Sequence, residues 1–165
     1  MSAAILDGCG ALPLRTFAAG ETVLAEGTRS GKLYVLVSGS VETVKGDVQI
    51  NTAGEPGAFF GEVAALLDAP HTATVRALEP STFHVADDPL AFMRSTPEVT
   101  LQLARLLARR LHFLTTYLVD VKHQFQDQTD HLAMVDDVLE SLLHHHDHES
   151  SPGSDRCPDP DPTTE

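Results

Sequence analysis

The stretch FFGEVAALLDAPHTATV, residues 59–75, decides the fold. Its Gly61 predicts a tight turn, and the Ala and Leu residues after it predict a short helix over residues 61–67. Backbone N–H groups converge at such a turn, and the positive end of the helix dipole adds to their attraction for an anion. The last residues, TATV, predict a strand. The stretch therefore predicts a cradle for a small anion between a helix and a strand.

The residues around this stretch, from 14 to 88, predict strands. Short apolar runs such as ETVLAEG and KLYVLVSGSVETV alternate with turns, and glycines mark the turns at positions 20, 27, 31, 39, 46, 54, 57 and 61. Evenly spaced short strands joined by glycine turns are typical of an antiparallel sheet that rolls up on itself. In VKGDVQI we expect a tight hairpin, with a positive φ at Gly46.

A long helix is predicted over residues 97–146. Pro97 suits the first turn of a helix, Thr96 suits its N-cap, and no Pro or Gly follows before Pro152. At 1.5 Å per residue such a helix would be ~75 Å long. The expected fold class is therefore mainly β with α: an antiparallel, jelly-roll-like β-roll followed by a long C-terminal helix.

Apolar residues of this helix, interrupted only by Gln128, recur at spacings of four and three. This pattern predicts a coiled-coil seam over 107–142 and hence a homodimer. The alternative is a helix that packs on its own β-domain and ends near residues 126–130, with a second short helix folding back. The seam positions are Leu107, Leu111, Leu114, Leu118, Val121, Phe125, Gln128, Leu132, Val135, Leu139 and Leu142.

The remaining residues, 147–165, are rich in Pro, Asp and Ser and predict a disordered acidic tail. His144 and His148 precede it at a spacing of four, which would let them share a metal on a helix. A solvated helix end is the simpler interpretation, so we expect no metal site. We also find no Ser–His–Asp or Cys–His arrangement, and expect no enzyme activity.

Charge and cysteine content restrict the environment and the partners. The chain has 11 Lys and Arg against 24 Asp and Glu, a net charge of −13, which argues against nucleic acid as a partner. Cys9 and Cys157 stand far apart, as expected of free thiols in a reducing compartment. No apolar run approaches the roughly 20 residues that span a bilayer. We expect a cytoplasmic protein without a membrane partner.

The stretch FGEVAALL followed by PHTATV resembles the phosphate-binding cassette of cyclic nucleotide-binding domains. These are the sensory modules of catabolite activator-type regulators, of protein kinase A regulatory subunits and of cyclic nucleotide-gated channels. The resemblance covers about residues 12–125: residues 17–42 are similar to the family's first strands, and LARLLARRL, 103–111, to its C-terminal helix. Only about 40 residues follow Phe125, and this stretch is strongly acidic, so we expect a stand-alone domain without a helix-turn-helix.

The resemblance implies a set of ligand-binding residues. Glu62 corresponds to the residue that holds the ribose 2′-hydroxyl, and Thr72 and Ala73 to residues that touch the phosphate. Leu114 and Thr115 follow the helix stretch near which the family binds the base. The full set is Phe60, Gly61, Glu62, Val63, Ala64, His71, Thr72, Ala73, Arg110, Leu114 and Thr115.

His71 departs from the family pattern, which has Arg at this position. A His offers one N–H where an Arg offers a charged fork, and the loss of about 2–4 kcal/mol would weaken binding roughly 30- to 700-fold. If a nucleotide binds, Arg76, Arg109 or Arg110 would supply the positive charge that the family's Arg provides at position 71. Alternatively, His71 selects another ligand or makes binding dependent on pH, or the pocket is empty.

Two functions of different classes follow. The first is a regulatory module that binds cAMP or cGMP, needs no cofactor and signals through an effector protein. The second is a degenerate domain that serves as a dimeric interaction scaffold without nucleotide. A DNA-binding transcription regulator is a less favoured third, because of the negative charge.

Overall fold

The computed structural model describes residues 2–124, 135, 138, 139 and 142. The chain divides into two compact units, Met1–Arg110 and Leu111–Glu165. The first unit holds all eight strands of the described part. The strands are β1 Leu14–Phe17, β2 Thr22–Leu24, β3 Leu33–Ser38, β4 Val41–Lys45, β5 Val48–Ala53, β6 Phe59–Phe60, β7 Thr74–Ala77 and β8 Ser81–Ala86. The helices are α1 Ser2–Gly8, α2 Glu62–Leu67, α3 Pro89–Ser95 and α4 Pro97–Gln124.

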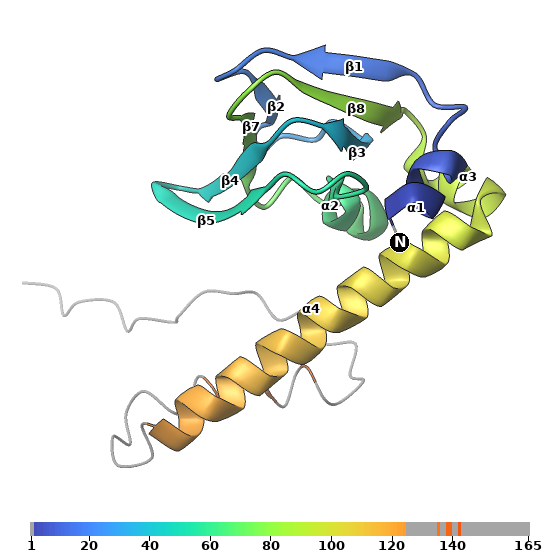
Figure 1. The fold of residues 1–165 in the computed structure, drawn as a ribbon. Coiled ribbons are helices and arrows are strands. Elements are labelled where there is room, and N and C mark those ends of the chain that lie inside the picture. The colour runs from blue at the N-terminus through green and yellow to red at the C-terminus, as the bar shows by residue number, and fades with distance from the viewer. Residues whose placement is uncertain (1, 125–134, 136–137, 140–141, 143–165) are drawn as a thin grey trace, which may run out of the picture. The chain divides into compact units, whose positions relative to one another are not determined.

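The strands form two antiparallel four-stranded sheets (Figure 1). One sheet has the order β1-β8-β3-β6 and the other the order β2-β7-β4-β5. The predicted hairpin is present as β4–β5, and Gly46 in its turn has φ 56°. The expected fold class, a β-roll with a long C-terminal helix, is confirmed.

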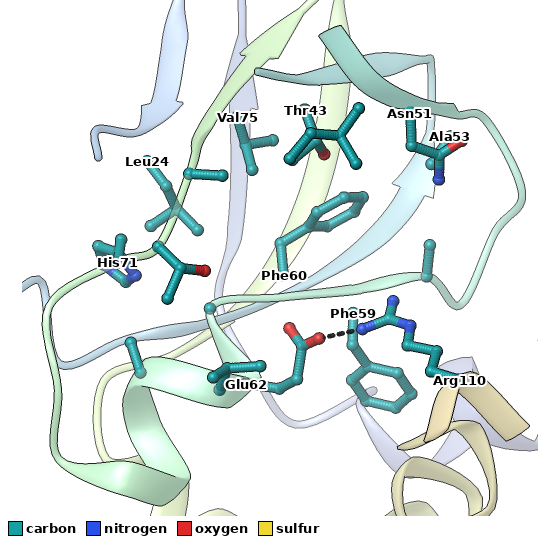
Figure 2. A pocket seen from close by; sticks show the side chains of 17 residues that line it. Leu24, Thr43, Asn51, Ala53, Phe59, Phe60, Glu62, His71, Val75 and Arg110 are labelled. Atoms are coloured by element: carbon teal, nitrogen blue, oxygen red, sulfur yellow. Dashed lines mark hydrogen bonds and ion pairs between the residues drawn. The ribbon is translucent and has the colours of Figure 1, made fainter. Parts of the chain in front are cut away.

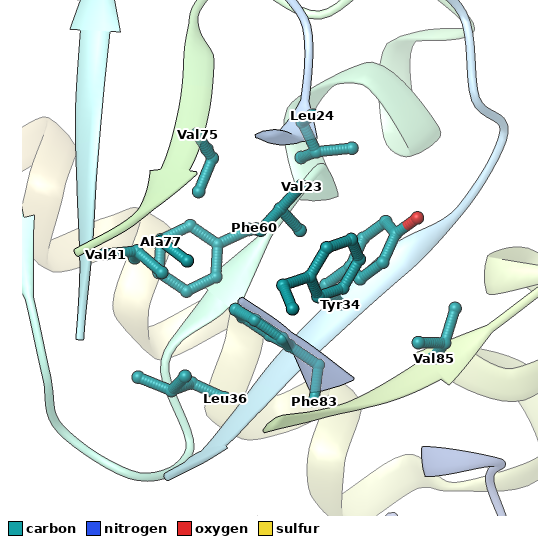
Figure 3. Packing of buried hydrophobic residues seen from close by; sticks show 11 residues of the cluster. Val23, Leu24, Tyr34, Leu36, Val41, Phe60, Val75, Ala77, Phe83 and Val85 are labelled. Atoms are coloured by element: carbon teal, nitrogen blue, oxygen red, sulfur yellow. The ribbon is translucent and has the colours of Figure 1, made fainter. Parts of the chain in front are cut away.

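Aromatic side chains fill the space between the two sheets (Figure 3). The rings of Phe17, Tyr34 and Phe60 each meet Phe83 nearly edge-on, with centroids 5.6–6.0 Å apart. This edge-to-face geometry is the favoured arrangement of aromatic pairs. The cluster fixes β6, and with it the turn that leads into α2.

A second core cluster lies on the other side of β3. Alternation along β3 points Tyr34 and Leu36 into the first cluster and Leu33 and Val35 into the second. The second cluster joins β3 to α1, α3 and the first turns of α4, whose contributions include Ile5, Cys9, Phe92, Met93, Val99 and Leu103. Burial raises the pKa of the Cys9 thiol to about 11, so this free cysteine is protonated and unreactive.

The junction before α4 differs in detail from expectation. The helix begins at Pro97 as predicted, but the Thr96 hydroxyl donates to the carbonyl of Phe92 at 2.6 Å, where an N-cap hydroxyl would accept from α4. Thr96 thus closes the end of α3, and its own carbonyl accepts from Thr100 N–H at 3.1 Å.

Within the predicted helix over 97–146, α4 extends to Gln124, and the described residues 135, 138, 139 and 142 are also helical. The proposed break at 127–130, the His144 and His148 pair and the tail over 147–165 all lie outside the described residues. Within the described part of the chain, no helix combines the length and the apolar character that crossing a membrane requires.

Candidate functional site

Gly61 forms the turn at the head of α2. It is the residue before Glu62 and has φ 83°, in the left-handed region that favours glycine. A Cβ at this position would lie 2.7 Å from the carbonyl oxygen of Lys32, which is too close for any other residue. The backbone therefore needs glycine here whether or not a ligand is bound.

A cavity of about 330 Å³ opens beside this turn (Figure 2). Its walls come from α2, from residues 71–73, from the β4–β5 hairpin and from α4. Nine of the eleven predicted site residues line it: Phe60, Gly61, Glu62, Val63, Ala64, His71, Thr72, Ala73 and Arg110. Leu24 and Arg110, which are 86 residues apart in sequence, both line this one cavity.

Leu114 and Thr115 are not among the lining residues. They belong to α4 beyond Arg110, in the second compact unit. The Thr115 hydroxyl donates to the carbonyl of Leu111 at 2.9 Å, a contact within its own helix. A role of these two residues at a ligand stays a prediction.

Glu62 and Arg110 form an ion pair at the cavity wall (Figure 2). Nη1 of Arg110 donates to Oε1 of Glu62. The side chain of Glu62 is only 7% exposed, whereas that of Arg110 is 52% exposed. A carboxylate this deeply buried needs a partner, because burying an unpaired charge is costly. Arg110 is that partner, and the carboxylate oxygens of Glu62 can also accept hydrogen bonds from hydroxyl groups.

His71 is buried and turned toward the loop before β3. Its Nε2 accepts from the backbone N–H of Ser30 at 3.3 Å and lies 2.8 Å from the Ser30 hydroxyl. Because a backbone N–H can only donate, this contact assigns the ring proton to Nδ1 in the neutral form. Burial also lowers the pKa of His71. Both observations indicate a neutral imidazole at pH 7.

Backbone hydrogen bonds hold the His71 segment in place. The N–H of His71 donates to Thr28 O at 2.9 Å, and its carbonyl accepts from Gly27 N–H at 2.8 Å. Thr72, next in the chain, is exposed at the cavity. The segment thus presents the Thr72 hydroxyl and backbone, without a cation of its own.

Of the three arginines considered as replacement cations, Arg110 lines the cavity. Arg76 donates from Nε and Nη2 to Oε1 of Glu42, at 2.7 and 2.5 Å, on the outside of the sheet and away from the cavity lining. Arg109 lines a different cavity. Arg110 is therefore the guanidinium that a ligand in this cavity would meet among the described residues.

The β4–β5 hairpin contributes lining residues that the sequence did not indicate. Thr43, Ile50 and Asn51 belong to this group, and Thr43 pairs with Asn51 in the hairpin register. The hairpin itself was predictable. That its open face would form a cavity wall depends on how the two sheets roll together, and no local pattern carries that information.

Comparison with known proteins agrees with this geometry. Residues 14–88 match the family model of the cyclic nucleotide-binding domain. The chain is 41% identical over 61 residues to a cAMP-dependent protein kinase regulatory subunit of Yarrowia lipolytica, covering 37% of this chain and 16% of the relative. It is 32% identical over 111 residues to a CRP-like cAMP-activated global transcriptional regulator of Mycobacterium tuberculosis, covering 64% and 50%.

Among solved structures, the catabolite activator protein of Thermus thermophilus has a similar fold. The TM-score is 0.63 at 22% identity, over 86% of this chain and 81% of the other. The chain spans half or less of the length of the two curated relatives described above. What those whole proteins do is therefore not carried over with the domain.

Proposed function

We propose that this chain is a regulatory module that binds a cyclic nucleotide, cAMP or cGMP, in the cavity beside α2. The observation that carries the proposal is the buried Glu62 carboxylate, which pairs with Arg110 in the first turn of α2 and lines the same cavity. The cavity volume of about 330 Å³ lies at the lower end of the range for small-molecule pockets.

The ribose and the cyclic phosphate each have a partner in this proposal. Glu62 accepts from the ribose 2′-hydroxyl. The backbone at residues 61–62 and 71–73 holds the cyclic phosphate, helped by Nδ1–H of His71. Arg110 supplies the positive charge that His71 does not. Because one neutral donor replaces a charged fork, we expect affinity in the high micromolar to millimolar range.

The module acts through a protein partner in this proposal and is not itself an enzyme. The net charge of −13 does not favour contact with nucleic acid. A homodimer through the seam over 107–142 would transmit the signal, since five seam positions lie on α4 and two of them, Leu111 and Leu114, are each 45% exposed.

The alternative is a dimeric scaffold without nucleotide. It is favoured by the neutral, buried His71 and by the fact that Arg110 is already engaged with Glu62. In that case the cassette supports the fold alone, and the seam carries the function.

Calorimetric titration with cAMP and cGMP separates the two. The wild type is compared with His71→Arg and Glu62→Gln, with Arg76→Gln as a control for a guanidinium outside the cavity. We expect weak wild-type binding that His71→Arg strengthens at least ~10-fold and Glu62→Gln weakens. No binding by either wild type or His71→Arg would refute the sensor and leave the scaffold.

A further inference from the structure

The β4–β5 hairpin contains a β-bulge at the wall of the cavity beside α2. Thr43 pairs with Asn51, and the next residue of β4, Val44, pairs with Gln49. Ile50 is thus an extra residue on β5 that pairs with no residue of β4. A bulge bends its strand and redirects side chains, and bulges are enriched next to active sites. At this point β5 departs from a regular edge strand.

The bulge changes which side chains reach the cavity. Neighbouring residues of a regular strand point to opposite faces of the sheet. Ile50 and Asn51 are neighbours, yet both line the cavity beside α2. Ile50 is 57% exposed, so its apolar side chain is open to contact. The bulge therefore brings an apolar side chain and an amide to the same cavity wall.

Asn51 lies at the end of the cavity away from His71 (Figure 2). Phe60 and Glu62 lie between these two residues in that view. In the proposed function the cyclic phosphate lies at residues 71–73 and the ribose at Glu62. The base, which is the remaining part of the nucleotide, then extends toward Asn51.

The side chain of Asn51 is available to bind the edge of a base. The residue is exposed and, within the described part of the chain, its amide makes no hydrogen bond. An amide presents an acceptor and donors side by side. Adenine presents the complementary pair, a donor at N6 and an acceptor at N7, and Asn forms two hydrogen bonds with it. Guanine presents acceptors at both N7 and O6, so the amide oxygen would face another acceptor.

The other polar groups of the cavity do not offset this preference. Arginine recognises guanine with a fork of two donors to N7 and O6. Nη1 of Arg110, however, already donates to Glu62. The donors on the other edge of guanine require an acceptor such as a carboxylate. Among the described residues that line the cavity, Glu62 is the only carboxylate, and it pairs with Arg110. The lining therefore suits adenine better than guanine.

From these observations we infer that the bulge at Ile50 and Asn51 forms the base subsite of the cavity and selects adenine, so that cAMP is the preferred nucleotide. Ile50 packs against a face of the ring. Oδ1 of Asn51 accepts from N6, and Nδ2 donates to N7. The inference rests on the proposed function and deepens it, because that proposal leaves the choice between cAMP and cGMP open.

The test measures the dissociation constants of the full chain for cAMP and cGMP from amide chemical shifts, which detect weak binding. His71→Arg is measured in parallel, because the proposed function expects it to bind more tightly. We expect both proteins to bind cAMP about five-fold more tightly than cGMP or better, with shifts at Thr43 and Asn51. Equal affinities, or a preference for cGMP, would overturn the inference and leave the proposed sensor standing. If neither protein bound either nucleotide, the sensor and the inference would both be refuted.

Variants on β5 isolate the amide. Asn51→Leu should remove the preference for cAMP over cGMP. Gln49→Leu removes an exposed amide from the same strand outside the cavity, and should keep the preference. A preference that survives in Asn51→Leu, or that disappears equally in Gln49→Leu, would show that Asn51 does not read the base. Ile50→Ser should weaken cAMP and cGMP by similar factors, since the ring face is common to both purines, and unchanged affinities would remove Ile50 from the subsite.

An analogue of cAMP in which carbon replaces N7 tests the contact atom by atom. The wild type should bind this analogue about three-fold more weakly than cAMP, because Nδ2 of Asn51 loses its acceptor. Asn51→Leu should bind the two equally, because it has no donor to lose. An equal loss of affinity in the wild type and in Asn51→Leu would show that Asn51 does not contact N7, and would overturn the inference.

Discussion

At Gly61 both the backbone conformation and the close packing against Lys32 require a residue without a Cβ. Its φ is 83°, and its missing Cβ leaves room for the carbonyl of Lys32. A left-handed conformation costs an ordinary residue about 1–2 kcal/mol, and the clash with backbone adds to this cost. Gly61→Ala should therefore lower the free energy of unfolding by more than about 2 kcal/mol, measured by urea titration.

Gly46 provides the matched control for this prediction. Its φ is also positive, at 56°, but a Cβ there would meet nothing within 4 Å. Gly46→Ala should lower the free energy of unfolding by only about 1–2 kcal/mol. Equal losses in the two variants would mean that close approach to Lys32 contributes nothing, and that conformation alone selects glycine at residue 61.

Burial of His71 predicts how the free energy of unfolding changes with pH. Burial lowers its pKa in the folded state below the value of about 6.5 expected of the unfolded chain. The unfolded state then binds more protons, so stability is fully present above about pH 6.5 and is lost as the pH falls through the folded-state pKa. Urea unfolding between about pH 8 and pH 5 should show this loss in the wild type and a smaller one in His71→Gln.

The same shift bears on the suggestion that a charged His71 holds the ligand in mild acid. With the pKa lowered by burial and a backbone N–H pointing at Nε2, the imidazolium is disfavoured at pH 6. Titration with cAMP at pH 6 should thus give an affinity no higher than at pH 8. Binding confined to pH 6 would show that the ligand itself raises the pKa of His71.

At the residue scale, the features of the site that depend on neighbouring residues were predictable from the sequence. Gly61 and Glu62 adjoin each other, and the turn, helix start and first-turn carboxylate are all encoded within three residues. The orientation of His71 was not predictable in this way. It depends on Ser30, 41 positions away, and no pattern within either segment indicates the contact.

The pair of Glu62 and Arg110 connects α2 to α4. Arg110→Met would leave a nearly buried carboxylate without its partner. Losing one member of a fully buried pair costs about 3–5 kcal/mol. Because Arg110 is half exposed and water screens the pair, we expect a loss of about 1–2 kcal/mol.

Urea unfolding checks this prediction, with Arg109→Met as the control on the same helix. The double variant Glu62→Gln with Arg110→Met should recover part of the loss, since it no longer buries a charge. If the double variant were as unstable as the sum of the single ones, the two side chains would not interact in solution.

The apolar face of α4 predicts self-association. Leu114, at the centre of the described seam, is 45% exposed, and an aspartate there would place charges opposite each other in a dimer. Leu114→Asp should convert the dimer to a monomer in sedimentation velocity. Thr116→Asp adds the same charge at an exposed position of α4 outside the seam and should leave the dimer intact.

Helix α1 shows what element prediction misses. It has seven residues, too few to be stable by propensity, and no pattern in the sequence predicts it. Ile5 and the adjacent Cys9 are buried in the second core cluster, so tertiary packing stabilises the helix. The β4–β5 hairpin was predicted because its turn residue encodes it locally.

At the scale of the molecule, the pairing of the strands is the main feature that the sequence does not predict. β1 pairs with β8, and β3 with both β8 and β6, over long sequence separations. Apolar runs and glycine turns predicted a rolled antiparallel sheet, but they do not state which strands are neighbours. The specific fold, a β-roll, was predictable because the cassette over residues 59–75 resembles that of a known family. The composition of the whole chain does not identify the fold.

If the cavity and the seam are linked, their coupling must be reciprocal. Whatever factor dimerisation adds to cAMP affinity, cAMP must add to dimerisation. Because a homodimer has two cavities, we therefore expect the ratio of dimer dissociation constants without and with saturating cAMP to equal the square of the ratio of cAMP dissociation constants in Leu114→Asp and wild type. Calorimetry gives the first ratio and sedimentation equilibrium the second. Equal cAMP affinities in the monomeric variant and the wild type would mean that the seam does not sense the cavity, and a regulatory signal would then have to leave the domain by another surface.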